Sequence, residues 1–277
     1  MRRWIVLLTM AVVVLLVAGD WAARRSWDGA TLDALEVLGR STGNLGEAQN
    51  GDIERLPPVA ERYFRFALPP GQRPIRSARL AQGGEFATKP GQWQPFKAVE
   101  YFSARAPGFV WDARIQMLPA IPVLVRDSYL AGEGAMLARL RGSIPMVDQR
   151  GTRELAEAAL MRWLAEAVWI PTALLPGPGV EWSGSEDGGA RVTVLDHGVR
   201  VSVDLEFGAL GEIVKVKALR YRDVAGRLVA TPWMGRFGPY ERRDGMQIPG
   251  SAEVAWVVDG SEQPYWRGRL LEVRYSY

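Results

Sequence analysis

Few side chains of this sequence combine the types and spacing that catalysis requires. The chain has one histidine, His197, and no cysteine, which excludes a cysteine nucleophile, a thiolate zinc site and a disulfide framework. His197 falls in a predicted turn between strands, and a general base usually needs an orienting partner, so we interpret it as structural or simply exposed. The motifs of serine hydrolases, zinc proteases, phosphate loops and dinucleotide sites are absent. The sequence therefore predicts no catalytic residue, no metal site and no cofactor.

Carboxylates leave one catalytic alternative open. Asp112 and Asp127 would form a general acid and base pair if their strands were adjacent and in a suitable register, and this would make the protein a carboxylate-dependent hydrolase. Arg126 and Asp127 follow one another in a predicted strand, so they point to opposite faces and cannot act on one ligand. An inward-facing charge needs a partner. We therefore predict a cross-strand pair here, with ligand contact as the alternative.

Tryptophan-rich segments are the more informative feature. The chain has 11 Trp, several of them near glycines and prolines, as in TPWMGRFGPYERRDGMQIPG (231–250). Such rings suit a packed core, which is the simpler interpretation, or the lining of an apolar cavity. In the cavity interpretation, Arg236 or Arg126 meets a polar head group. The predicted ligand-binding residues are Trp111, Trp163, Trp169, Trp233, Arg236, Arg126 and Tyr129.

The first 25 residues form a targeting or anchoring segment. Residues 4–19 read WIVLLTMAVVVLLVAG, carry no charge and follow Arg2 and Arg3. We expect a single-pass transmembrane anchor whose arginines stay cytoplasmic, with a cleaved signal peptide as the alternative. Either interpretation places residues 26–277 outside the cytoplasmic membrane, anchored to it or, after cleavage, periplasmic or secreted.

The remainder of the chain is electrically neutral. Residues 1–25 hold four arginines and Asp20, which account for the whole net charge of +3. Nucleic-acid binding needs a concentrated basic face. We therefore predict no nucleic-acid partner, and we expect a membrane and a hydrophobic small molecule as the partners.

From residue 75 onward the apolar period is two, which indicates strands. Short turns with Gly or Asp-Gly join many of them, and these favour antiparallel neighbours. Two segments alternate most clearly, at 109–117 and 199–207. Further strands are predicted at 75–83, 93–104, 123–131, 135–141, 190–195, 212–222, 226–237, 251–258 and 265–275.

Helical spacing interrupts this pattern at 152–168, where Leu155, Leu160, Trp163 and Leu164 share one stripe, with Arg162 largely off it. We predict a mainly β (α+β) fold in which about ten antiparallel strands form a strongly curved sheet, an open or half barrel, with this helix on its concave side. Residues 55–277 would form this domain, with a proline-bounded helix in 55–71. Residues 26–54 would be a linker with a short helix at 30–39.

Four sequence segments resemble those of an uncharacterised family of bacterial proteins. They are PPVAERYFRFALP (57–69), AEAVWIPTALLP (165–176), YRDVAGRLVATPWMGRFGPYERRDGMQIP (221–249) and PYWRGRLLEVRY (264–275). The resemblance covers most of residues 55–277 and implies no activity or catalytic residue. In outline, the meander with one inserted helix is also similar to the periplasmic lipoprotein-carrier half barrel, which holds acyl chains under a helical lid.

Our leading hypothesis is a membrane-anchored extracytoplasmic domain that binds a lipid or similar molecule in an apolar groove. The alternatives are an interaction or scaffold module of the cell envelope with a solid core, and the hydrolase. A cavity of about 300 to 1,000 Å³ between helix and sheet would favour the first over the second.

Overall fold

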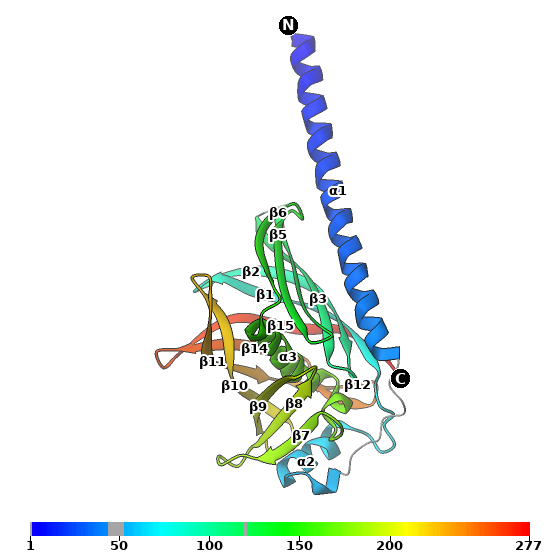
Figure 1. Ribbon diagram of the computed structural model, residues 1–277, viewed down its shortest axis with the longest axis vertical. Coiled ribbons are helices and arrows are strands. Elements are labelled where there is room, and N and C mark those ends of the chain that lie inside the picture. Colours follow the sequence, from blue (N-terminus) through cyan, green and yellow to red (C-terminus); the bar gives the residue numbers. More distant parts are fainter. Residues whose placement is uncertain (1, 44–52, 119–120) are drawn as a thin grey trace.

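The computed structural model describes residues 2–43, 53–118 and 121–277. Within these residues the main element is a strongly curved antiparallel sheet of thirteen strands, beside a separate two-stranded hairpin (Figure 1). The predicted fold class is confirmed, although the number of strands exceeds the predicted ten.

The sheet has two arms. The first arm runs through β1 Ser77–Lys89, β2 Gln92–Ser103, β3 Gly108–Leu118, β4 Ile121–Leu130, β5 Glu133–Leu140 and β6 Ile144–Arg150. The second arm runs through β7 Val180–Gly184, β8 Ala190–Asp196, β9 Val199–Phe207, β10 Ile213–Val224, β11 Arg227–Phe237, β14 Ser251–Val258 and β15 Ser261–Ser276. The separate hairpin is β12 Tyr240–Arg243 with β13 Met246–Pro249.

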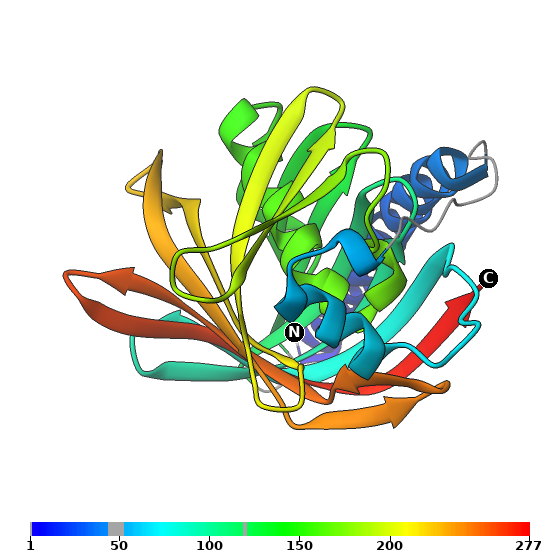
Figure 2. The same ribbon diagram turned by 90° about the horizontal axis from the view of Figure 1, so that it is seen from below.

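The arms join where the first and last strands pair. β1 pairs with β15, so the sheet order is β6-β5-β4-β3-β2-β1-β15-β14-β11-β10-β9-β8-β7. β6 and β7 are the free edges. The chain between them holds α3 Arg153–Glu166 and the short 3-10 helices η2 Ala167–Trp169 and η3 Pro171–Leu174. The covering helix therefore links the two edges, and the sheet curves around it (Figure 2).

Each of the eleven predicted strand segments corresponds to a strand. The agreement arises because side chains alternate between the two faces of a strand. In β9 the valines at alternate positions are buried and the residues between them are not. β6 and β7 were not predicted. β6 reads IPMVDQR and is mostly exposed, and β7 is five residues long, so neither has one buried face that would produce an alternating pattern.

Two helices precede the sheet. α2 Pro58–Ala67 begins after Pro57 and ends before Pro69, as the sequence predicts, and it buries Tyr63 and Phe64 against the core. A 3-10 turn, η1 Ile53–Arg55, lies before it. Residues 44–52 of the predicted linker lie outside the described residues.

α1 Arg2–Gly43 is one continuous helix of 42 residues, where the sequence predicted a short separate helix at 30–39. Its C-terminal half lies along the first arm of the sheet, and its N-terminal half extends beyond the sheet (Figure 1). Among the residues of α1 whose burial is described, Trp27, Thr31 and Leu38 are buried. They lie on one face of the helix, and packing of this face against the sheet explains why the helix continues through the predicted break.

Across the described part of the chain, the helices lack a stretch with both the length and the apolar character that crossing a membrane requires. The transmembrane anchor predicted for residues 4–19 is therefore not confirmed. The predicted domain boundaries remain predictions.

Candidate functional site

α3 forms the centre of the molecule. Thr152 caps its N-terminus by accepting a hydrogen bond from the Leu155 amide at 3.2 Å, and nine of its fourteen residues are buried. It contacts strands of both arms, β5 and β4 on one side and β9, β10 and β11 on the other. The backbone approaches closely at Gly134 of β5, where an added Cβ would lie 2.5 Å from the Leu155 carbonyl oxygen.

The space between α3 and the concave face is filled by side chains. The Trp163 ring stacks on Phe102, with 5.3 Å between ring centroids, and its Nε1 donates to the Ser103 carbonyl at 2.9 Å. Trp169 donates to the Pro249 carbonyl, also at 2.9 Å. Both indoles are buried with their polar atoms satisfied inside the fold. At these two positions the structure is a packed core.

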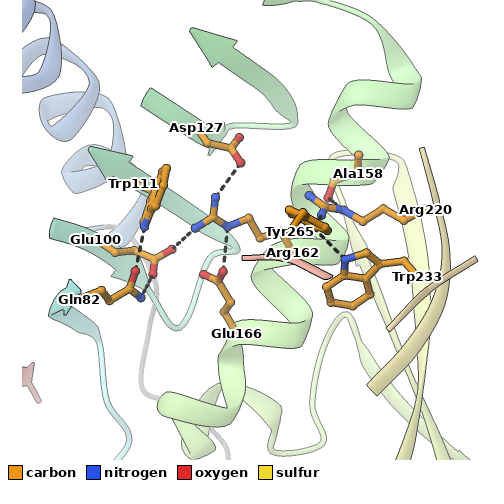
Figure 3. A network of polar contacts seen from close by, with 10 residues as sticks. All are labelled: Gln82, Glu100, Trp111, Asp127, Ala158, Arg162, Glu166, Arg220, Trp233 and Tyr265. Carbon is orange, nitrogen blue, oxygen red and sulfur yellow. Dashed lines mark hydrogen bonds and ion pairs between the residues drawn. The ribbon is translucent and has the colours of Figure 1, made fainter. Parts of the chain in front are cut away.

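One largely buried cation, Arg162, projects from α3 toward the sheet, with 14% of its side chain exposed. The Arg162 guanidinium contacts three carboxylates, with nitrogen–oxygen distances of 2.8 Å to Asp127, 2.8 Å to Glu166 and 3.7 Å to Glu100 (Figure 3). It also lies 4.8 Å from the ring centroid of Trp111. Three acids around one base leave excess negative charge, and burial makes that charge costly.

Glu100 is the carboxyl group whose pKa responds to this excess negative charge. Its side chain is fully buried, and burial together with the charge of Glu166 raises its pKa well above the ordinary value, although Arg162 opposes the shift. Gln82 donates to Glu100 at 3.0 Å and accepts from Trp111 Nε1 at 2.8 Å. Burial alone would lower the pKa of Arg162, but Glu166, Asp127 and Glu100 outweigh it, and the pKa is raised. The network therefore combines an arginine held in its charged form with a carboxyl group, Glu100, whose neutral form is favoured.

A second polar cluster lies on the other side of α3. Arg220 of β10 donates from Nε to the Ala158 carbonyl of α3 at 3.1 Å and from a terminal nitrogen to the Tyr265 hydroxyl at 3.2 Å (Figure 3). Trp233 Nε1 donates to the same hydroxyl at 2.9 Å. This cluster connects the second arm to the helix.

The arms also contact each other directly. Tyr129, at the end of β4, donates to the Asp196 carboxylate at 2.8 Å, and the same carboxylate oxygen lies 2.9 Å from Nδ1 of His197. Gly132 lies against His197, because a Cβ added there would be 2.6 Å from the histidine Cβ. His197 thus has the orienting partner that the sequence did not reveal, and it lies in the turn between β8 and β9 as predicted.

A family model of unknown function, DUF6920, matches residues 54–275. The chain belongs to the DUF6920 family. This confirms the resemblance to an uncharacterised family. No curated protein matches the chain in sequence.

Two solved structures share the outline of this DUF6920 domain. A LolA superfamily protein from Nitrosomonas europaea is 9% identical, with a TM-score of 0.42, and the match covers 79% of this chain and 92% of that one. A DUF1329 family protein from Desulfovibrio piger is 12% identical, with a TM-score of 0.39, and the match covers 73% and 86%.

The seven predicted ligand-binding residues of the DUF6920 domain do not converge on one site. Arg126 lies on the outer face, where it donates to Thr31 and to the Trp27 carbonyl of α1. Arg236 is an exposed partner of Glu262. The remaining five are buried in the core: Trp111, Trp163, Trp169, Trp233 and Tyr129.

The aspartate pair considered for hydrolysis is not formed. β3 and β4 are adjacent, but Asp112 is opposite Arg126 and Asp127 is opposite Trp111 in the register, so the two carboxylates lie on opposite faces. Asp112 instead accepts hydrogen bonds from Trp27 and Thr31 of α1. Groups of His, Cys, Asp or Glu that could hold a metal ion are absent from the described part of the chain.

Arg162 and Glu100 were not predicted from the sequence as site residues. The helical stripe placed Arg162 off the packing face, but both arms pack against α3, so this side is covered as well. The sequence does contain a signal for Glu100, because it alternates in β2 with the same spacing as the buried Phe96, Ala98 and Phe102 and so lies on their face. A charged residue on the apolar face of a strand indicates a buried partner.

An open depression of about 690 Å³ lies on the outer face of β1, β11, β14 and β15. In β15 the core residues Trp266 and Leu270 alternate with Arg267 and Arg269, which line the depression on the opposite side. Glu85 pairs with Arg267 across the strands. The depression therefore carries charged side chains, and it is separated by the sheet from the interior around α3.

Proposed function

We propose that this domain binds a lipid or a similar hydrophobic molecule between α3 and the concave face of the sheet, in an open form in which α3 has moved away. The observation that carries the proposal is the helix itself, which joins the two free sheet edges and fills an apolar concave surface with its own side chains. An acyl chain would replace those side chains when α3 leaves. A ligand that binds only the open form shifts the population toward that form.

The Arg162 network lowers the free-energy cost of moving α3 away from the sheet. A buried ion network stabilises a fold less than well-packed apolar residues of similar volume do. When α3 moves away, Arg162 and Glu166 leave with it, and water then solvates both these groups and the carboxylates of Glu100 and Asp127. Hydration offsets part of the free energy lost on opening, so the network makes the separation of helix and sheet less costly than a wholly apolar contact would.

A disulfide between the two arms tests the proposal. The chain has no cysteine, so Gly132→Cys with His197→Cys creates a single thiol pair where the β4–β5 and β8–β9 turns touch. Small loop adjustments bring the two Cβ atoms to the usual separation of about 3.8 Å. The oxidised form keeps both arms closed around α3. We expect it to lose binding of a fluorescent fatty-acid probe and the reduced form to regain it, with each single-cysteine variant as the control.

Bound material gives an independent readout. Organic extraction of the purified full-length protein, followed by mass spectrometry, should recover a lipid at near-stoichiometric amounts. Recovery of no lipid, together with equal probe fluorescence in the oxidised and reduced forms, would overturn the proposal.

The second candidate is an interaction or scaffold module with a solid core. The filled space between α3 and the sheet favours it, as do the indoles of Trp163 and Trp169, whose polar atoms are satisfied internally. This candidate requires that neither redox form of the arm-linked variant binds the probe. The same experiment therefore separates the two candidates.

We further propose that residues 4–19 attach the domain to the cytoplasmic membrane, with residues 26–277 on the extracytoplasmic side. Trp4, Leu7, Met10, Val14 and Val17 are exposed on α1, and Arg2 and Arg3 precede them. Apolar side chains on this segment suit a membrane, and the arginines favour the cytoplasmic side. Deletion of residues 2–19 should release the protein from washed membranes, and a full-length chain found wholly in the washed-off fraction would contradict this.

A further inference from the structure

The concave face of the β10–β11 hairpin carries three arginines. Arg220 and Arg222 lie on the same face of β10 as Ala218, which packs against the core, because they follow it at steps of two residues. Val224 also lies on this face, and Arg227 is its partner across the hairpin, so Arg227 shares the face. The residues between them in β10 point to the other face. The hairpin therefore presents a row of guanidinium groups on the side of the sheet that holds α3.

Aromatic rings lie directly beside two of these arginines. The Arg220 guanidinium is 5.5 Å from the ring centroid of Trp233 and 6.0 Å from that of Trp256. Arg222 is 5.9 Å from the same Trp256 ring. Tyr265 stacks on Trp256 at 5.5 Å, and its hydroxyl accepts from Arg220 and Trp233. Rings and guanidinium groups together form one continuous surface that is apolar on its ring faces and cationic at its edge.

These arginines have no acidic partner in the described part of the chain. None of them lies within ion-pair distance of a carboxylate of the described residues, and Nε of Arg222 is buried without a hydrogen-bond partner. The neighbouring acid Asp223 is engaged elsewhere, since it accepts from Gln149 and the Gly226 amide. A partly buried cation ordinarily has a counter-charge. This cluster therefore has unused capacity for an anion.

The position of Arg220 connects the cluster to α3. Its Nε donates to the carbonyl of Ala158, which lies in the middle of α3 and is already a helix acceptor. If α3 moves away, Arg220 loses this acceptor, and its Nε becomes available to another one. The cationic capacity of the cluster thus increases in the same open form that exposes the apolar surface.

We propose that Arg220 and Arg222, with Trp233, Trp256 and Tyr265, bind the anionic group of the ligand, a phosphate or carboxylate whose apolar chain extends along the rings toward the space under α3. This inference rests on the proposed function and specifies the ligand as an anionic amphiphile. Arginine suits this role because its planar guanidinium donates two hydrogen bonds to one anion while it stacks on a ring.

Calorimetric titration of the full-length protein tests the site with three probes. Dodecyl phosphate below its micellar concentration carries both the chain and the anion, dodecanol carries the chain alone, and inorganic phosphate carries the anion alone. We expect dodecyl phosphate to bind about ten-fold or more tightly than dodecanol, because a hydrogen bond to a charged group contributes at least this factor. Raising the salt concentration should reduce the difference.

The Arg222→Gln variant should bind dodecyl phosphate about ten-fold more weakly and dodecanol unchanged. Arg222 is the preferred position because Arg220 also holds α3. Arg200→Gln, which removes an exposed partner of Glu181, is the matched control and should leave all three affinities unchanged. Unfolding midpoints confirm that the variants fold.

The outcomes separate the site from the proposed function. If inorganic phosphate binds with the same dependence on Arg222 while dodecanol does not bind, the anion site is supported and the hydrophobic-ligand function fails. If dodecanol and dodecyl phosphate bind equally, or Arg222→Gln has no effect on dodecyl phosphate, the anion site is overturned and the function stands.

Discussion

Arg126 and Asp127 are neighbours in β4 and bind two different helices on opposite faces of the sheet. Arg126 contacts the Trp27 ring of α1 on the outer face, 4.3 Å from its centroid, and Asp127 pairs with Arg162 of α3 on the inner face. The inward charge, Asp127, therefore pairs with a helix residue, and the predicted cross-strand pair is not formed. One strand fixes both the outer and the inner helix, because successive side chains of a strand alternate between faces.

Removal of the buried cation should destabilise the fold strongly. Arg162→Met leaves Glu100, Asp127 and Glu166 without their counter-charge, and loss of one partner of a buried pair costs about 3–5 kcal/mol. Urea unfolding measures the change. Arg153→Met is the control on the same helix, where the exposed pair with Glu157 contributes under about 1 kcal/mol. Equal effects of the two variants would contradict a central role for the network.

Stability should depend on pH through Glu100. Its pKa is raised in the folded chain by burial and by Glu166, from an ordinary value of 4.5. Above that value the folded chain retains a proton that the unfolded chain has lost, so the free energy of unfolding falls as pH rises through the window up to the folded pKa.

Glu100→Gln removes this dependence, because the amide stays neutral at every pH. We expect the variant to match the natural chain at pH 4 and to exceed it in stability at pH 8, as urea unfolding at both pH values would show. Glu181→Gln, at an exposed position, is the control and should leave the pH dependence unchanged. A natural chain more stable than Glu100→Gln at pH 8 would contradict this prediction.

α1 should detach when its central tryptophan is removed. Trp27 is 3% exposed, packs against Arg126 and donates to Asp112 at 3.1 Å. Trp27→Ala should increase amide hydrogen exchange in residues 26–40 while the strands stay protected. Trp21→Ala, at a position 62% exposed on the same helix, should leave exchange unchanged. Unaltered exchange in Trp27→Ala would show that other contacts hold the helix.

The contact between the arms should contribute measurably to stability. Tyr129→Phe deletes the hydroxyl that donates to Asp196 at 2.8 Å, and a hydrogen bond to a charged group contributes about 1.5–3 kcal/mol. Thermal and urea unfolding report the loss. Tyr221→Phe on β10 is the matched control, since its hydroxyl makes no hydrogen bond within the described residues. If both variants unfold alike, the contact does not hold the arms together.

The sequence alone determined eleven of the strands, the covering helix and the proline-bounded helix. Strand and helix periods depend on which residues of a short segment face the core, so Phe109 and Trp111 in β3, or Leu160 and Trp163 in α3, indicate their elements without any knowledge of distant partners. Four segments of the sequence also indicated the family.

Only the tertiary structure decided which faces are covered and which side chains meet. The pairing of β1 with β15 closes the curve around α3, so Arg162, which the helical stripe placed outside, lies largely covered beside the buried Glu100. Docking of α1 places Arg126 against Trp27. Such contacts join residues far apart in the chain, and the volumes that fill the space under α3 are a property of the whole packed core. Local periodicity carries no information about either.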